Sequence, residues 1–128
     1  MHLNKIHHTA IICSNYEKSK KFYTKILGLE IINETYRKER DSYKLDLKLG
    51  EYNQVELFSF PSSPKRPSYP EACGLRHIAF EVDDIEKEVE FLIKNTIAVE
   101  PIRIDEIKNK RFTFFSDPDG LPIELYEA

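Results

Sequence analysis

The stretch "HIAFEVDDIEKEVEFL" (residues 77–92) decides the fold, because its pattern occurs a second time as "HTAIICSNYEKSKKFY" at residues 8–23. Both stretches open with a histidine, place an alanine shortly after it, and share a Glu-Lys pair and a phenylalanine at matching positions. Each begins with the alternation of apolar and polar residues that is typical of a strand, followed by a helical pattern. "VELF" (55–58) and "IELY" (123–126) match in the same way. The sequence therefore predicts two copies of one module.

Each module is predicted to contain one strand, one helix and three further strands. In the first module, Asn15 is suited to cap the helix and Gly28 to follow its end. In the second, Asp84 caps a helix that runs to about residue 94. The strands are expected near residues 5–13, 29–37, 43–49 and 54–60, and then near 77–82, 98–104, 111–116 and 122–126. The expected fold class is α+β, with two βαβββ modules whose curved mixed sheets form a metal-binding cleft.

The 128 residues are expected to form a single domain. The first module covers about residues 1–60 and the second about residues 74–128. Between them, residues 61–73 form a linker, and its "PSSPKRPSYP" segment holds four of the seven prolines. Proline-rich segments are stiff and extended, so this one is interpreted as a spacer. A role in a dimer contact or as a lid is the alternative.

Composition excludes several functional classes. The net charge of −3 gives no basic surface for nucleic acid, and no apolar stretch is long enough for a membrane span. The N-terminus lacks the layout of a secretory signal. Two cysteines with no paired spacing favour a reduced, cytoplasmic setting. These features predict a cytoplasmic protein.

Each module opens with a histidine and closes with a glutamate at almost the same spacing. From His8 to Glu56 is 56 − 8 = 48 positions, and from His77 to Glu124 is 124 − 77 = 47. Strand alternation places all four side chains on the face opposite the core. Two imidazoles and two carboxylates suit a divalent metal, whereas buried carboxylates alone would repel each other. A single histidine is more often a hydrogen-bonded side chain, but the duplication favours ligands. The neighbouring His7 is expected on the opposite face, with a supporting contact as the alternative.

These residues resemble a known family. The motifs "HHTAI", "VELF", "LRHIAFEVDD" and "DPDGLPIELYE" are similar to the vicinal oxygen chelate superfamily, which includes glyoxalase I, bleomycin resistance proteins and dioxygenases. The stretches "RDSYKLDL" and "KRFTFFSDPDGLPIELYE" resemble short bacterial glyoxalase-like proteins of the YaeR type. The resemblance implies a metal held by His8, Glu56, His77 and Glu124. It also implies a homodimer, and nickel or cobalt as the favoured metal, with zinc or manganese possible.

The chemistry implied by the resemblance is that of a lactoylglutathione lyase, in the detoxification of methylglyoxal. A hemithioacetal, formed from an α-ketoaldehyde and a thiol, is isomerised through an enediolate to a 2-hydroxyacyl thioester. Glu124 is the first choice for the base that moves the proton, and Glu56 is its catalytic partner. The two histidines hold the metal.

The sequence departs from glyoxalase I at the positions that grip glutathione, where Ile12, Phe60 and Cys73 offer no cation. Another thiol or a chelating metabolite is therefore an open alternative. Five cations elsewhere are candidate substitutes for a carboxylate-binding residue: Arg37, Arg76, Lys108, Lys110 and Arg111. Dioxygenases and thiol transferases of the same superfamily use two histidines and one glutamate, and epimerases usually show an amide where Glu56 stands. A sequestering resistance protein is the alternative that is not an enzyme.

Overall fold

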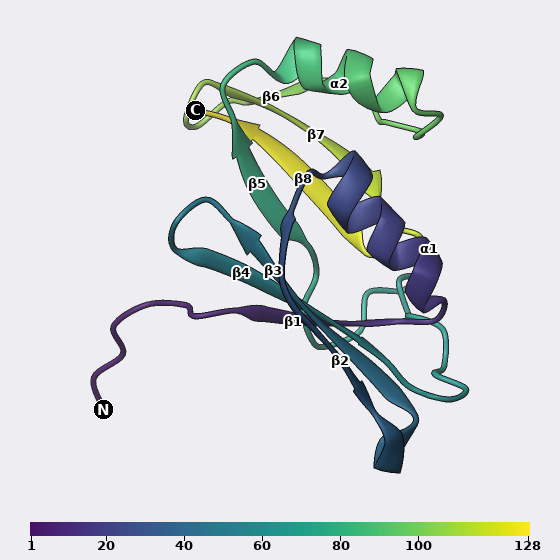
Figure 1. Ribbon diagram of the computed structural model, residues 1–128. Helices are drawn as coiled ribbons and strands as arrows, with labels where there is room; N and C mark the ends of the chain where they lie inside the picture. The colour runs from purple at the N-terminus through teal and green to yellow at the C-terminus, as the bar shows by residue number, and fades with distance from the viewer. The chain divides into compact units, whose positions relative to one another are not determined.

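The computed structural model describes residues 1–128 and divides them into two compact units, Met1–Lys65 and Arg66–Ala128. Each unit contains a four-stranded mixed sheet and one main helix (Figure 1). The predicted α+β class and the two modules of strand, helix and three strands are confirmed. Neither helix is long and apolar enough to cross a membrane.

In the first unit, the first strand of the sheet pairs with the last strand. Its strand order is β1-β4-β3-β2, with β1 parallel to β4 and the other neighbours antiparallel. A π-helical turn, η1, continues the helix α1, and a 3-10 turn, η2, follows β2. The elements are β1 (Thr9–Cys13), α1 (Tyr16–Lys21), η1 (Phe22–Ile26), β2 (Glu30–Arg37), η2 (Lys38–Arg40), β3 (Ser42–Leu49) and β4 (Asn53–Ser59).

The second unit repeats this topology. Its strand order is β5-β8-β7-β6, with β5 parallel to β8 and the other neighbours antiparallel. Its first strand therefore pairs with its last, as β1 pairs with β4 in the first unit. The elements are β5 (Ile78–Val82), α2 (Ile85–Lys94), β6 (Arg103–Asp105), β7 (Lys110–Ser116) and β8 (Pro122–Glu127).

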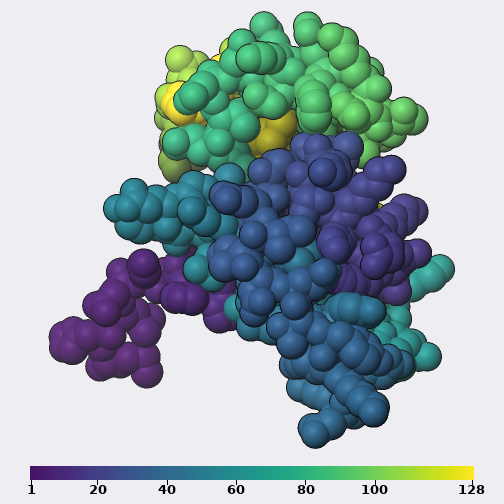
Figure 2. Space-filling model, viewed as in Figure 1, coloured from purple at the N-terminus to yellow at the C-terminus, as the bar shows by residue number.

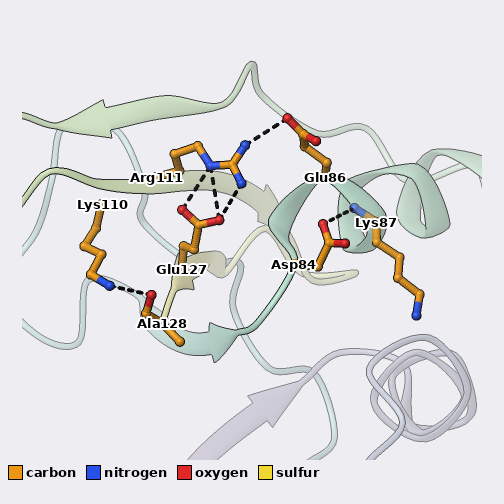
Figure 3. A network of polar contacts seen from close by, with 7 residues as sticks. All are labelled: Asp84, Glu86, Lys87, Lys110, Arg111, Glu127 and Ala128. Atoms are coloured by element: carbon orange, nitrogen blue, oxygen red, sulfur yellow. Dashed lines mark hydrogen bonds and ion pairs between the residues drawn. The ribbon is translucent and has the colours of Figure 1, made fainter.

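Both predicted helix caps are present. The side chain of Asn15 accepts a hydrogen bond from the backbone N–H of Lys18 at 3.1 Å. Asp84 accepts the equivalent bond from Lys87 at 3.1 Å (Figure 3). Each bond satisfies one of the N–H groups that the first helical turn leaves without a partner, which fixes where the helix begins.

One face of each sheet is buried, and the opposite face carries the candidate ligands Glu56 and Glu124. Leu45 and Leu57 are almost fully buried in the first unit, and Ile123 takes this place in the second. The residues that alternate with them include Glu56 and Glu124, which therefore lie on the other face. The remaining core side chains come from the helices, the strands and two connecting segments: Ile11, Cys13, Tyr16, Phe22, Tyr23, Leu29, Leu47, Val55, Ile85, Leu92, Phe115, Leu121 and Leu125.

An arginine network joins three elements of the second unit. Arg111 of β7 donates from Nε to Glu127 of β8 at 2.9 Å, and from a terminal nitrogen to Glu86 of α2 at 2.8 Å (Figure 3). Lys110 donates to the backbone carbonyl of Ala128. The ion pair with Glu127 raises the pKa of Arg111 and lowers that of Glu127. Arg111 and Lys110 are thus already engaged inside this unit.

Two predicted strands are shorter in the structure. The strand expected at 5–13 begins only at Thr9, and residues 1–8 precede it as an exposed segment (Figure 2). Thr9 pairs with Val55, so residues 1–6 run past the beginning of β4 and have no partner strand. The strand expected at 98–104 is reduced to Arg103–Asp105. Pro101, which has no N–H to donate, interrupts the ladder that Glu100 starts with the carbonyl of Phe114.

Candidate metal centre

His8 and Glu56 come together through the parallel pairing of β1 with β4. Glu56 lies opposite Ala10 in this register, and His8 stands just before β1. Nε2 of His8 is 3.5 Å from Oε2 of Glu56. The glutamate side chain is only 12% exposed and the histidine 42%. The small side chain of Ala10 leaves room for the imidazole beside the carboxylate.

The second unit forms the same pair. Glu124 lies opposite Ala79, and His77 stands just before β5. Nε2 of His77 is 3.0 Å from Oε2 of Glu124, with side-chain exposures of 32% and 14%. The predicted repetition of a histidine at the start of each module and a glutamate at its end is thus matched by two similar spatial pairs.

The geometry of both pairs fits two ligands of one metal ion. Ligand atoms about 2.1 Å from a metal, at neighbouring tetrahedral or octahedral positions, lie about 3.0–3.4 Å from each other. The His–Glu separations of 3.0 and 3.5 Å are close to that interval. An imidazole nitrogen and a carboxylate oxygen also suit nickel, cobalt, zinc or manganese. The donor atoms present in each unit therefore fit half of a four-ligand centre.

The pair in the first unit has charged neighbours. Asp46 lies opposite Glu56 in the register of β3 with β4. Nζ of Lys44 is 3.2 Å from Oδ1 of Asp46 and 3.4 Å from Oε1 of Glu56. Its contact with Asp46, and then the charge of Glu56, raises the pKa of Lys44, so the ammonium stays charged at neutral pH. Glu56 is therefore held on one oxygen by His8 and on the other by Lys44.

The pair in the second unit has aromatic neighbours instead. Phe114 lies opposite Glu124, at the position that Asp46 takes in the first unit. Its ring meets the imidazole of His77 edge to face, with 5.2 Å between centroids. Nδ1 of His77 is buried and makes no hydrogen bond, so the polar contact of this ring is made by Nε2, which faces Glu124. No lysine or arginine lies within ion-pair distance of Glu124.

Each unit brings together one of the predicted pairs, and no group of three or more His, Cys, Asp or Glu side chains is placed to hold an ion. The complete four-ligand set remains a prediction. The expectation that His7 lies on the opposite face is wrong: its Nδ1 is 2.9 Å from Nδ1 of His8. Both His7 and His8 precede β1, which begins at Thr9, so strand alternation does not decide the side on which His7 lies.

Sequence reasoning missed Lys44 and Asp46 as neighbours of the candidate ligands. The signal was present in "YKLDLK" (43–48), where charged residues alternate with apolar ones along one predicted strand. Such alternation places the charges on the face opposite the core, which is the face of Glu56. What the sequence did not give was the register that sets Asp46 directly opposite Glu56.

Comparison with known proteins identifies the family. Residues 5–125 match the model of the Glyoxalase/Bleomycin resistance protein/Dioxygenase superfamily. The chain therefore belongs to this superfamily. It is 59% identical to YwkD of Bacillus subtilis, over 99% of both chains, and 56% identical to YaeR of Escherichia coli, over 98% of this chain and 97% of that one. The crystal structure of a glyoxalase family protein from Enterococcus faecalis is 50% identical and superposes with a TM-score of 0.92, over 99% of this chain and 100% of that one.

More distant relatives have names that specify a reaction. A probable lactoylglutathione lyase of Vibrio parahaemolyticus is 26% identical, over 96% of this chain and 90% of its own. The metallothiol transferase FosB of Staphylococcus haemolyticus is 31% identical, over 94% of this chain and 81% of its own. The names of these relatives specify different reactions, so membership of the superfamily does not by itself identify the reaction of this chain.

Proposed function

We propose that the protein is a metal-dependent lyase or isomerase of the glyoxalase I type. The observation that carries this proposal is the His–Glu pair that occurs once in each unit, at 3.5 and 3.0 Å. The similarity to a probable lactoylglutathione lyase supports the same reaction class. The substrate would be the hemithioacetal of an α-ketoaldehyde such as methylglyoxal, and the product a 2-hydroxyacyl thioester.

The proposed ligands are His8, Glu56, His77 and Glu124, in a centre for nickel or cobalt, with zinc or manganese as further candidates. When bound, the metal would polarise two vicinal oxygens of a substrate and favour negative charge on them. The four ligands would come from one chain or from two chains of a cytoplasmic homodimer. His8 and His77 would fix the centre, and the two carboxylates would neutralise its charge.

Among the two carboxylates, Glu124 is the better candidate for the general base. Glu56 has Lys44 at one oxygen and His8 at the other. Glu124 has one polar partner, His77, whose Nε2 lies 3.0 Å from Oε2 of the glutamate. A carboxylate with fewer partners is freer to take a proton from the carbon that bears the thiol and return it to the neighbouring carbon. This transfer converts the hemithioacetal to the thioester with no net gain or loss of atoms, and Glu56 would assist on the other side of the substrate.

A metallothiol transferase is the second candidate, and the 31% identity to FosB favours it. That reaction would add a thiol to a small electrophile instead of moving a proton within one. Glu56 distinguishes the two candidates. Thiol transferases of this superfamily use two histidines and one glutamate as metal ligands and have no ligand at the position of Glu56. The fourth candidate ligand, Glu56, matches the pattern of glyoxalase I, which favours the lyase.

The test is metal loading followed by turnover. Metal-free protein would be loaded with nickel, cobalt, zinc or manganese, and thioester formation from methylglyoxal would be followed with several thiols. We expect turnover that depends on the metal and on one preferred thiol. If the loaded protein bound metal but formed no thioester with any thiol, the lyase proposal would be wrong. Thiol consumption with an epoxide substrate would then identify the transferase.

A further inference from the structure

Arg37 lies on the same sheet face as the His8–Glu56 pair. In the ladder of β2 with β3, Arg37 pairs with Ser42, and Lys44, which contacts Glu56, follows two residues later on the same face. In the ladder of β3 with β4, Lys44 pairs with Phe58. The guanidinium carbon of Arg37 is 5.0 Å from the centre of the Phe58 ring. All of these contacts lie within the first unit.

The guanidinium of Arg37 is fixed in place but not neutralised. One terminal nitrogen donates to the hydroxyl of Ser42 at 2.7 Å, and the group also lies 5.6 Å from the centre of the Phe60 ring. The Phe58 and Phe60 rings are parallel within 4°. No carboxylate lies within ion-pair distance of Arg37, and its buried Nε makes no hydrogen bond.

Arg103 of the second unit provides an internal comparison. Its guanidinium carbon lies 4.9 and 5.8 Å from the ring centres of Phe112 and Phe114, distances close to those of Arg37, although these two rings are perpendicular to each other. Arg103, however, forms an ion pair with Glu100 at 3.0 Å. Contact with two phenyl rings therefore does not require an unpaired charge, and Arg37 differs from Arg103 in that it has no acidic partner.

The other cations that the sequence offered are less suitable. Arg111 is bound by Glu127 and Glu86, and Lys110 by the carbonyl of Ala128. Arg76 has Glu71 at 3.7 Å. Lys108 lies in the exposed turn between β6 and β7. Of the five, only Arg37 is half-buried, without an acidic partner, and on the face of a candidate metal-ligand pair.

We propose that Arg37 binds a carboxylate at one end of the substrate whose vicinal oxygens are held near His8 and Glu56. The inference rests on the proposed function for the position of the chelating end. Phe58 follows Glu56 by two residues on β4, a step of about 7 Å along a strand. The substrate class is thus a carboxylate-bearing chelator in which one short spacer separates the two ends. The phenyl rings of Phe58 and Phe60 would shield the ion pair from water, which strengthens it.

The first experiment tests Arg37 without any metal. Benzoate is titrated into the metal-free protein, and the Nε–H signals of Arg37 and Arg103 are followed by NMR. We expect a saturable shift of the Arg37 signal and little change at Arg103. Benzoate should also shift the backbone signals around Ser42, the partner of Arg37, and this effect should be lost in Arg37→Met. The wild-type titration decides the question even if this variant does not fold. No shift at Arg37, or equal shifts at both arginines, would overturn the proposal.

The second experiment tests the distance from the metal ligands. Benzohydroxamate and 4-carboxybenzohydroxamate, which chelate through two adjacent oxygens, are titrated calorimetrically into the nickel-loaded protein. We expect the carboxylate to tighten binding by about tenfold or more in wild type and in Arg103→Met, but not in Arg37→Met. An equal gain in all three proteins would contradict the inference. If neither hydroxamate bound, the proposed metal function would fail, while the benzoate result would still judge Arg37.

Discussion

Nζ of Lys44 lies 3.4 Å from Oε1 of Glu56, so the first candidate carboxylate already has a cation beside it. A bound metal ion would repel this ammonium and compete with it for the same carboxylate. Lys44→Met is therefore expected to tighten metal binding roughly threefold to tenfold. Competition with a chelating indicator for nickel or zinc measures the change.

Lys48→Met is the matched control for Lys44, because Lys48 lies on the same strand, is exposed and has no acidic partner within ion-pair distance. Its metal affinity is expected to equal that of wild type. Equal tightening in both variants would mean that net charge, and not the contact with Glu56, sets the affinity.

Exchange of the two carboxylates for amides separates a base from a ligand. Glu124→Gln is expected to lower kcat about 10²- to 10⁴-fold, because the amide cannot accept the proton. Glu56→Gln is expected to weaken metal binding more and to recover part of its activity at saturating metal. Thioester formation at increasing metal concentration measures both effects.

Glu81→Gln serves as the control for these two variants. Glu81 is exposed on β5, the strand that pairs with the strand of Glu124. Its activity should remain that of wild type. Full recovery of Glu124→Gln by added metal would reverse the proposed roles and assign the base to Glu56.

The ion pair between Lys20 and Glu34 predicts a pH dependence of stability. Lys20 donates to Glu34 at 2.7 Å and Tyr16 donates to the same oxygen, so the pKa of Glu34 is lowered in the folded protein. Its stabilising effect is complete above the unfolded pKa of about 4.3 and is lost as the pH falls through the lower folded value. Because the carboxylate is 39% exposed, the expected contribution at pH 7 is only about 0.5–1 kcal/mol.

Urea unfolding of wild type and Glu34→Gln, from neutral pH down into the acid range, tests this effect. The free energy of unfolding of the two proteins should differ at pH 7 and converge below the folded pKa of Glu34. Glu30→Gln, an exposed change on the same strand, should leave the difference from wild type constant. A constant difference in Glu34→Gln as well would show that its carboxylate has no shifted pKa.

Leu57 links the core of the first unit to the candidate metal ligands, because it follows Glu56 on β4 and points to the opposite face. It is 1% exposed, so Leu57→Ala is expected to lower the free energy of unfolding by about 2–5 kcal/mol. Ile12→Ala removes a similar side chain that is 58% exposed and should change stability by less than about 0.5 kcal/mol. Chemical denaturation measures both, and similar losses would contradict the assignment of the buried face.

The repeat in the sequence was sufficient to predict the two modules and to pair each histidine with its glutamate. His8 and Glu56 matched His77 and Glu124 in spacing, and strand alternation gave their common face. Features that depend on where a ladder begins, or on which side chains surround a residue, could not be predicted in this way. The contact of His7 with His8 depends on β1 beginning at Thr9, and the unpaired charge of Arg37 depends on which side chains lie around it.

The parallel pairing of the first and last strands in each unit has a consequence for biosynthesis. Glu124 lies on β8, the final strand of its unit, whereas His77 stands before the first. A growing chain therefore exposes this histidine many residues before the glutamate has left the ribosome. A metal ion bound as proposed would be held by both side chains only after β8 had docked beside β5, so metal capture would mark the completion of folding in that half of the protein.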